Sequence, residues 1–572
     1  MKTLSVKRGL AAACVALIVA ACALTQFILP TDAGSSCAGS ITAAEVNTWF
    51  ESGSASLNGA VKPANSVTFP NVPNCSFYKW SEQMFLWLTS PAPPRYGSGG
   101  GLVMNTPAFF DVSLPDASGQ RHFEPHTAGG IRAFNLRTAQ RGFLDLPIVL
   151  QKGTLRLLEV LPPVVAPSGR PMVQDADGNE VEVADLHVLN ERGPVLLDAN
   201  GREIKAPRAL LRSKADREPS LIERKLGQIE RFDRSELVQK LVFKDKFVLL
   251  DLLGNFHETE QGQADGGVLM AQNGSLVYYS LTVNNVFALF RTMQGTTVPA
   301  NTQFPVTQAQ LNSVLTFAAA HGRAPVIDSE ALAIEIKASW VEAAGLVDAD
   351  KFIQMTAIVP TYDKSNPNDW VPNGTQTVKL AMVGMHVVGS TAGHPELLWA
   401  TFEHVSNGPA AAFTYSKLPS GTTTVPQNTV GNWVFAANGA AAPFNEMHMM
   451  MGGPDGSHIV PVSPFAIGPS NVLRTMPWGL AGSNANGNAE VISINGVVRA
   501  TLDPADLRRN YFHEGTTWTI FGAPPSAGNQ VGTNKLENTT LETFNQGGNC
   551  FNCHGTNTTA VSHIFNETKP LF

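Results

Sequence analysis

The second half of the chain is dominated by segments in which apolar and polar residues alternate. In residues 333–341, Glu335, Lys337 and Ser339 are each flanked by apolar residues. A period of two residues is typical of a strand that buries one face. Further segments of this kind lie at 377–388, 397–405 and 431–437. Because several strands of this type must pair and cover their apolar faces, they predict a large antiparallel sheet or a β-sandwich.

The first part of the chain has a different pattern. Residues 42–50 and 77–88 have helical apolar spacing, which places Trp80 and Met84 on one side of the second segment. Between Leu146 and Glu203, short apolar runs are separated by Asp-x-x-Gly sequences at Asp175 and Asp198, which predict hairpin turns rather than a calcium loop. The expected fold class is therefore α+β and β-rich, with an N-terminal helical part followed by an antiparallel sheet or sandwich.

Three regions are expected along the chain: an export signal over 1–33, an α+β region over 34–300, and a β-rich region over 301–572. Within them, residues 235–254 have a Ser N-cap, periodic apolar positions and a terminal Gly, which predict a helix. The dipeptide Asn495-Gly496, between apolar runs, predicts a hairpin turn.

The charge of the chain excludes some partners. The net charge is −7 and charged residues make up 15% of the sequence, with no sustained basic face, so no nucleic-acid partner is expected. Residues 201–235 are an exception, because Lys, Arg, Asp and Glu are concentrated there. Such a mixed run is either a solvated linker or a docking patch for a redox partner.

The N-terminus has the layout of an export signal. Lys2, Lys7 and Arg8 precede an apolar run that begins at Leu10. Three fates are open. The sequence Val-Ala-Ala-Cys ending at Cys22 resembles a bacterial lipobox and predicts a lipoprotein. Alternatively, the signal is cleaved near Ala33, or the apolar segment remains as an uncleaved anchor. Each of these places the body of the protein outside the cytoplasm, in the periplasm or on the outer membrane, with membrane contact only through this segment.

Two cysteines in the body, Cys37 and Cys75, have no other assigned role. An oxidising compartment lets them pair, so a disulfide is expected.

The tail contains the sequence Cys550-Phe551-Asn552-Cys553-His554, which is followed only by residues 555–572. Two thiols at this spacing match the two vinyl groups of haem, and the imidazole next to them can ligate the iron. A dithiol redox motif and half of a zinc site are the alternatives. Zinc needs two further ligands, and only His563 lies nearby in sequence.

Through this pentapeptide and its exported context the chain resembles the c-type cytochromes. The resemblance implies one haem c per chain, with thioether bonds to Cys550 and Cys553 and with His554 as the proximal iron ligand. Compact cytochromes of this class carry the motif near the N-terminus of a small helical domain. Here no such domain can follow the motif, so we expect the preceding sequence to enclose the haem.

Several residues are candidates for the sixth iron position. The richest group is the sequence around residue 447, and His513 and His563 are alternatives. The distal candidates are Met447, His448, Met449, Met450, Met451, His513 and His563. Arg508 and Arg509 are candidates for contacts with the haem propionates. His386, His394, Glu403 and His404 are interpreted as structural residues.

The expected function is transfer of single electrons in the bacterial cell envelope, to or from a redox partner protein. The alternative is a haem oxidoreductase of peroxidase type, with an open or weakly ligated iron. A Met/His copper-binding protein and a non-enzymatic envelope protein are further alternatives. The sequence contains no motif in a context that supports hydrolase, nucleotide or nicotinamide chemistry.

Overall fold

The computed structural model describes most of the chain from residue 27 onward. The residues outside the description are 1–26, 28, 71–73, 98–100, 115–119, 137–140, 143–145, 151–156, 162–163, 167, 169, 190–192, 211–236, 244–245, 258–266, 301, 453–456, 463, 480–483, 527, 537, 545, 547–549, 555–561, 563 and 566–567. Most of the predicted export signal, including Cys22, and most of the charged run at 201–235 therefore lie outside the described residues.

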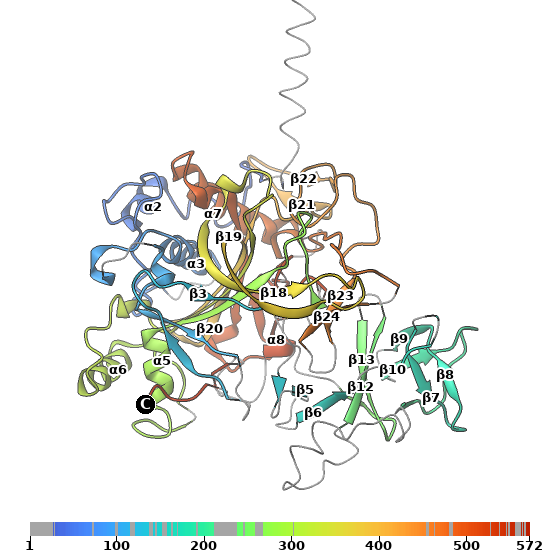
Figure 1. Ribbon diagram of the computed structural model, residues 1–572. Coiled ribbons are helices and arrows are strands. Elements are labelled where there is room, and N and C mark those ends of the chain that lie inside the picture. The colour runs from blue at the N-terminus through green and yellow to red at the C-terminus, as the bar shows by residue number, and fades with distance from the viewer. Residues whose placement is uncertain are drawn as a thin grey trace, which may run out of the picture.

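A ten-stranded sheet forms the centre of the molecule (Figure 1). In spatial order its path is β2 (Phe123–Pro125), β1 (Phe109–Val112), β16 (Tyr278–Asn284), β17 (Ile334–Glu342), β19 (Val371–Thr391), β20 (His394–His404), β25 (Tyr511–Thr519) and β26 (Gln530–Gly532). Neighbours along this path are antiparallel. Off the path, β18 (Gln354–Asp363) pairs with β19, and β3 (Arg132–Ala133) runs parallel to β18. The predicted α+β, β-rich fold with a large antiparallel sheet is confirmed, and the sheet takes strands from both sides of residue 300.

Two N-terminal helices are present where the sequence predicts them. They are α2 (Ala43–Trp49) and α3 (Cys75–Leu88). The Thr42 hydroxyl caps α2 by accepting from the N–H of Glu45. Trp80 and Met84 of α3 are buried, as their helical spacing indicates. The predicted disulfide between Cys37 and Cys75 is also present and ties the start of α3 to the segment before α2.

The two faces of β17 differ where the strand passes the centre of the sheet. On β17, Ile336 and Ala338 are buried in the main hydrophobic cluster together with Trp80 of α3. Glu335 and Lys337, the alternate residues of the same strand, point to the opposite face. The strand period of two thus separates Ile336 and Ala338, which share a cluster with α3, from Glu335 and Lys337 on the other face.

Further helices cover the edges of this core. They are α5 (Asn285–Met293), α6 (Gln308–Ala320), α7 (Ala485–Thr501) and α8 (Cys550–His554). Near the C-terminus, the Phe565 ring lies 5.4 Å from the ring of Phe287 in α5, and Arg291 Nε donates to the Phe565 carbonyl over 2.6 Å. The last residues of the chain are therefore fixed against α5.

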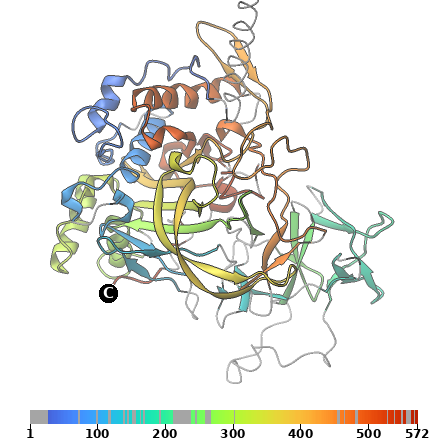
Figure 2. The same cartoon turned by 45° about the horizontal axis from the view of Figure 1, so that its top comes forward.

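Smaller sheets lie around the core. One group lies to the side of the main body in both views (Figure 1, Figure 2). Its strands are β4 (Arg141–Gly142), β5 (Leu146–Leu150), β6 (Leu157–Leu161), β7 (Met172–Gln174), β8 (Glu180–Glu182), β9 (Asp185–Leu189), β10 (Gly193–Leu197), β11 (Arg208–Ala209), β12 (Leu237–Phe243), β13 (Lys246–Asp251) and β14 (Phe256–His257). Beside the main sheet lie β15 (Gly267–Val268), β21 (Phe413–Ser416), β22 (Thr422–Val425), β23 (Met449–Gly452) and β24 (His458–Pro461).

The Asp-x-x-Gly sequences are turns, as predicted. Asp175 Oδ1 accepts the N–H groups of Asp177 and Asn179 and so closes the turn between β7 and β8. Asp198 makes the same pair of bonds to residues two and four positions on. A short carboxylate that binds its own following backbone is a turn-forming device.

The helix predicted over residues 235–254 is wrong. This segment forms the hairpin β12–β13, in which Val238 lies opposite Asp251 and Phe243 lies opposite Lys246. The apolar positions fit both a helical and a strand period. Strand β12 pairs with β6 in a six-stranded sheet. Because this pairing is not local, and because Val and Phe side chains suit strands, the segment forms a hairpin and not a helix.

The hairpin turn predicted at Asn495-Gly496 is also wrong, because both residues lie inside α7. Asn484 caps this helix by accepting from the N–H of Gly487. Asn495 is buried and donates to Glu82 Oε1 of α3 over 2.9 Å. Asn495, which the local pattern assigns to a turn, instead forms a contact between α7 and α3.

We predict that Phe85→Ala destabilises the fold by about 3 to 5 kcal/mol, because it removes a buried ring from the contact between α3 and the sheet. The Phe85 ring stacks on Phe402 of β20 with 4.2 Å between centroids. Chemical denaturation gives the free energy of unfolding. Leu57→Ala is the control, because Leu57 is 53% exposed, and it should change that free energy by less than about 0.5 kcal/mol. Equal effects of the two substitutions would contradict this packing.

Candidate functional site

The Cys550–His554 motif forms the short helix α8, and the His554 ring packs on Trp399 of the central sheet. The separation of three residues puts Cys550 and Cys553 about one helical turn apart. Phe551 is 1% exposed, and its N–H donates to Gln530 Oε1 of β26 over 3.2 Å. Phe551 thus anchors the helix, while Cys550 and His554 are half-buried at its surface.

The segment before α8 is held on the sheet by hydrogen bonds. The N–H and hydroxyl of Thr539 donate to the buried carboxylate of Glu403, each over 2.6 Å. The hydroxyl of Thr540 lies 2.6 Å from that of Ser339 in β17. Close approach requires Gly384 in β19, because a Cβ there would lie 2.6 Å from the Thr540 hydroxyl. The motif is therefore positioned by a polar tail laid across neighbouring strands.

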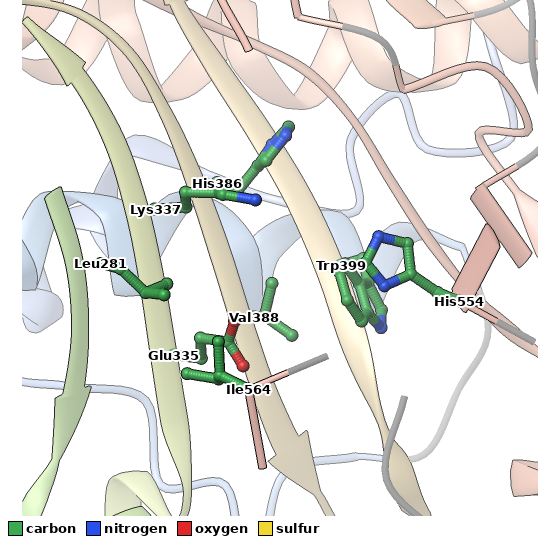
Figure 3. Close-up of a pocket in the computed structure, with 8 residues that line it drawn as sticks. All are labelled: Leu281, Glu335, Lys337, His386, Val388, Trp399, His554 and Ile564. Carbon is green, nitrogen blue, oxygen red and sulfur yellow. The ribbon is translucent and has the colours of Figure 1, made fainter. Parts of the chain in front are cut away.

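His554 lines a pocket between α8 and the sheet (Figure 3). The pocket holds about 380 Å³ of empty space, including space open to the solvent. Its lining residues are Leu281, Glu335, Lys337, His386, Val388, Trp399, His554 and Ile564. Six of these come from the four neighbouring strands β16, β17, β19 and β20, and the other two belong to α8 and the C-terminal segment.

The register of the strands explains how these residues meet. Lys337 of β17 lies opposite His386 of β19, and Glu335 lies opposite Val388. Val388 lies in turn opposite Trp399 of β20. Residues opposite each other in a sheet point to the same face, so this patch forms only when three strands are in this register.

Two polar atoms in the pocket are buried without a hydrogen-bond partner among the described residues. They are Nε1 of Trp399 and Oε2 of Glu335. The Trp399 ring packs on the His554 imidazole with 4.4 Å between centroids. Ser562 lies near the Glu335 carboxylate, but its hydroxyl is outside hydrogen-bond geometry. Buried polar groups are rarely left unpaired, so these two atoms make the pocket a candidate binding site.

The charges in the pocket are coupled. Burial raises the pKa of Glu335, and the nearby Lys337 opposes that rise. Burial also tends to raise the pKa of Glu542, but the adjacent His386 outweighs it and lowers the pKa. His386 Nε2 lies 2.9 Å from Glu542 Oε1, and its Nδ1 lies 2.8 Å from the Thr401 hydroxyl.

Both ring nitrogens of His386, which the sequence indicates as a structural residue, are hydrogen-bonded. It nevertheless faces the pocket. His394, likewise interpreted as structural, lies 2.8 Å from Glu396, and Glu403 pairs with Arg474 over 2.6 Å. His404 stacks on Phe352, and burial lowers its pKa to about 3.

The structure does not bring the predicted distal candidates to His554. Met447, Met449 and Met451 are buried in hydrophobic clusters around β23, and Met450 packs against one of them. His448 stacks on Phe465 with 4.2 Å between centroids. None of these lines the pocket.

Other predicted contacts also lie elsewhere. His513 is fully buried on the α3 side of the sheet, where it stacks on Phe402 and lies 2.8 Å from the Thr516 hydroxyl. Arg508 is buried and paired with Asp506 through two nitrogens. Arg509 is half-buried and is not among the pocket residues. His563 lies outside the described residues.

The motif has the residue types that a haem c needs, two cysteines and an adjacent imidazole. Of these residues, His554 lines the pocket, together with the apolar side chains of Leu281, Val388 and Ile564. Lys337 and the unpaired Trp399 N–H are the kinds of group that bind propionate carboxylates. Sequence reasoning missed this wall. The signal for part of it was the pair Glu335 and Lys337, two charges on one face of a strand predicted to be half-buried.

Among the described residues, no group of three or more His, Cys, Asp and Glu side chains has a geometry suited to a metal ion. Nor does the described part of the chain contain a helix long and apolar enough to cross a membrane. Comparison of the whole chain with family models, curated proteins and solved structures gives no match. The function must therefore be argued from the site itself.

We predict that Glu542→Gln lowers stability at pH 7 by about 2 kcal/mol, because it removes the charged partner of His386. A carboxylate with a lowered pKa stabilises the fold above its ordinary pKa of about 4.3, and this contribution is lost as the pH falls through the lowered pKa. The difference between wild type and variant should therefore shrink in acid. Denaturation at a series of pH values measures it. Glu330→Gln, at an exposed position, is the control, and a difference independent of pH would refute the role of this pair.

Proposed function

We propose that the protein is an exported haem c protein that transfers single electrons in the bacterial cell envelope, with one haem per chain. In this proposal Cys550 and Cys553 form the two thioether bonds, and His554 is the proximal iron ligand. One observation carries the proposal: the His554 ring lies at a pocket that contains two unpaired buried polar atoms, Trp399 Nε1 and Glu335 Oε2.

When bound, the haem supplies one-electron chemistry at its iron. The protein supplies orientation, since the Trp399 ring restricts the imidazole of His554. Leu281 and Val388 supply apolar surface on the sheet side of the pocket. A drier environment strengthens the influence of the nearby charges, including Lys337.

The electron donor or acceptor in this proposal is a partner protein of the envelope. Net charge and the lack of a basic face argue against nucleic acid as a partner. Membrane contact is assigned to the N-terminal segment alone.

A haem oxidoreductase of peroxidase type is the second candidate, and the chemistry of the pocket wall favours it. The side chains across from His554 include His386, Lys337 and Glu335, and no Met is among the lining residues. His386 can hold a proton at Nε2, where the Glu542 carboxylate accepts it over 2.9 Å. A positioned imidazole of this kind is suited to general acid–base work.

We predict that protein matured in a host with haem c biogenesis carries one covalently bound haem per chain, measured as a pyridine haemochrome. Replacing both Cys550 and Cys553 by Ser should abolish covalent haem, because no thioether can form. His321→Ala is the control, since His321 is exposed, and it should leave the spectrum unchanged. Colourless wild-type protein, or zinc bound to the thiolates, would overturn the proposal.

Carbon monoxide separates the two candidate functions. If two protein groups ligate the iron for electron transfer, adding carbon monoxide to the reduced protein should cause little rapid change in the absorption spectrum. A rapid and complete shift of the absorption spectrum would contradict electron transfer and support the oxidoreductase proposal. In that case His386→Gln should lower peroxide-dependent turnover by about 100-fold, while Glu330→Gln leaves it unchanged.

A further inference from the structure

Phe27 lies ahead of the cleavage position predicted near Ala33, yet it is part of the main hydrophobic core. Its side chain is 5% exposed. Its ring lies 4.7 Å from that of Phe512 and 5.5 Å from that of Trp478, centroid to centroid. Its backbone N–H donates to the Val405 carbonyl over 3.1 Å. A residue with these contacts is a structural element of the folded body.

Phe27 also covers a buried charge. The Arg474 guanidinium is fully buried and lies 4.5 Å from the Phe27 ring centroid and 4.8 Å from the Phe512 ring centroid. Two aromatic rings therefore contact one cation, an arrangement that is favourable when the cation is removed from water. Without Phe27, one of these contacts would be replaced by a cavity beside a buried ion.

The residues after Phe27 are bound to β21 and to the turn that follows it. Gly34 donates its N–H to the Ser416 carbonyl over 2.9 Å, and Leu418 donates to the Asp32 carbonyl over 2.9 Å. The Tyr415 hydroxyl donates to Asp32 Oδ1 over 2.6 Å. Cleavage near Ala33 would remove Asp32 and Phe27 together and interrupt this pairing.

We infer that Phe27 remains in the mature protein, so that the export segment is not removed near Ala33 and the residues just ahead of Phe27 hold the folded body to a lipid surface. Two attachments are compatible with this: a lipid on Cys22 or an uncleaved apolar anchor. The inference does not depend on the proposed haem chemistry, because it rests on contacts of the N-terminal segment alone.

The attachment point defines which face lies near the lipid. Five Cα steps separate Cys22 from Phe27, which span at most about 18 Å. The hairpin formed by β21 and β22, which receives residues 32–34, projects from the body (Figure 2).

Intact-mass measurement and N-terminal sequencing of full-length protein, matured in a bacterial host, test the inference. The expected product contains residues 27–33. A diacylglyceryl mass on an N-terminal Cys22 identifies lipid attachment. A mass that corresponds to the chain from its first residues identifies the uncleaved anchor. A mature chain that begins at Gly34, or at any residue after Phe27, overturns the inference, as does release of the intact product from membranes without detergent.

A substitution tests the packing independently. Phe27→Ala should lower the melting temperature by about 5 °C, because it opens a cavity against Arg474. Leu57→Ala, at an exposed position, should leave it within about 1 °C of wild type. An unchanged melting temperature for Phe27→Ala would contradict a structural role for this residue. If the variant does not accumulate, the mass of the wild-type protein still decides the question.

Discussion

The buried ion pair between Glu403 and Arg474 holds together segments that are far apart in the sequence. Both side chains are fully buried, and Arg474 Nη2 lies 2.6 Å from Glu403 Oε2. Glu403 also accepts from Thr539 in the tail, and Arg474 contacts the Phe27 ring at the N-terminus. Removing either charge would leave the other unpaired in a dry interior, which costs about 3 to 5 kcal/mol. Through these contacts the pair links the segments around Phe27 and Thr539 to β20.

The candidate site follows from the difference between the two faces of the sheet. The face toward α3 is closed by aromatic and aliphatic side chains, such as Phe85 on Phe402. The opposite face carries Glu335, Lys337 and His386, which need polar partners once they are covered. The Thr- and Asn-rich tail supplies part of these partners, and Glu542 supplies a carboxylate for His386. The pocket is where this covering is incomplete.

The sequence predicts the parts of the molecule that are encoded locally. Alternation identifies β17, helical spacing identifies α3, and the Cys550–His554 motif identifies the candidate haem ligands. Residues 237–251 and Asn495 are misassigned because pairing with β6 and the contact with α3 are not local. The pocket wall could not be predicted for the same reason, since Lys337, His386 and Trp399 meet only through the register of three strands.

The segments on both sides of α8 are held to the rest of the fold. Before α8, Thr539 and Glu542 bind residues of β20 and β19. After α8, Arg291 of α5 binds the Phe565 carbonyl, and Ile564 reaches the pocket. The residues that hold these segments belong to β19, β20 and α5, which are far from α8 in the sequence. The pocket is therefore lined both by the sheet and by the segment that crosses it, because Trp399 comes from β20 and His554 from α8.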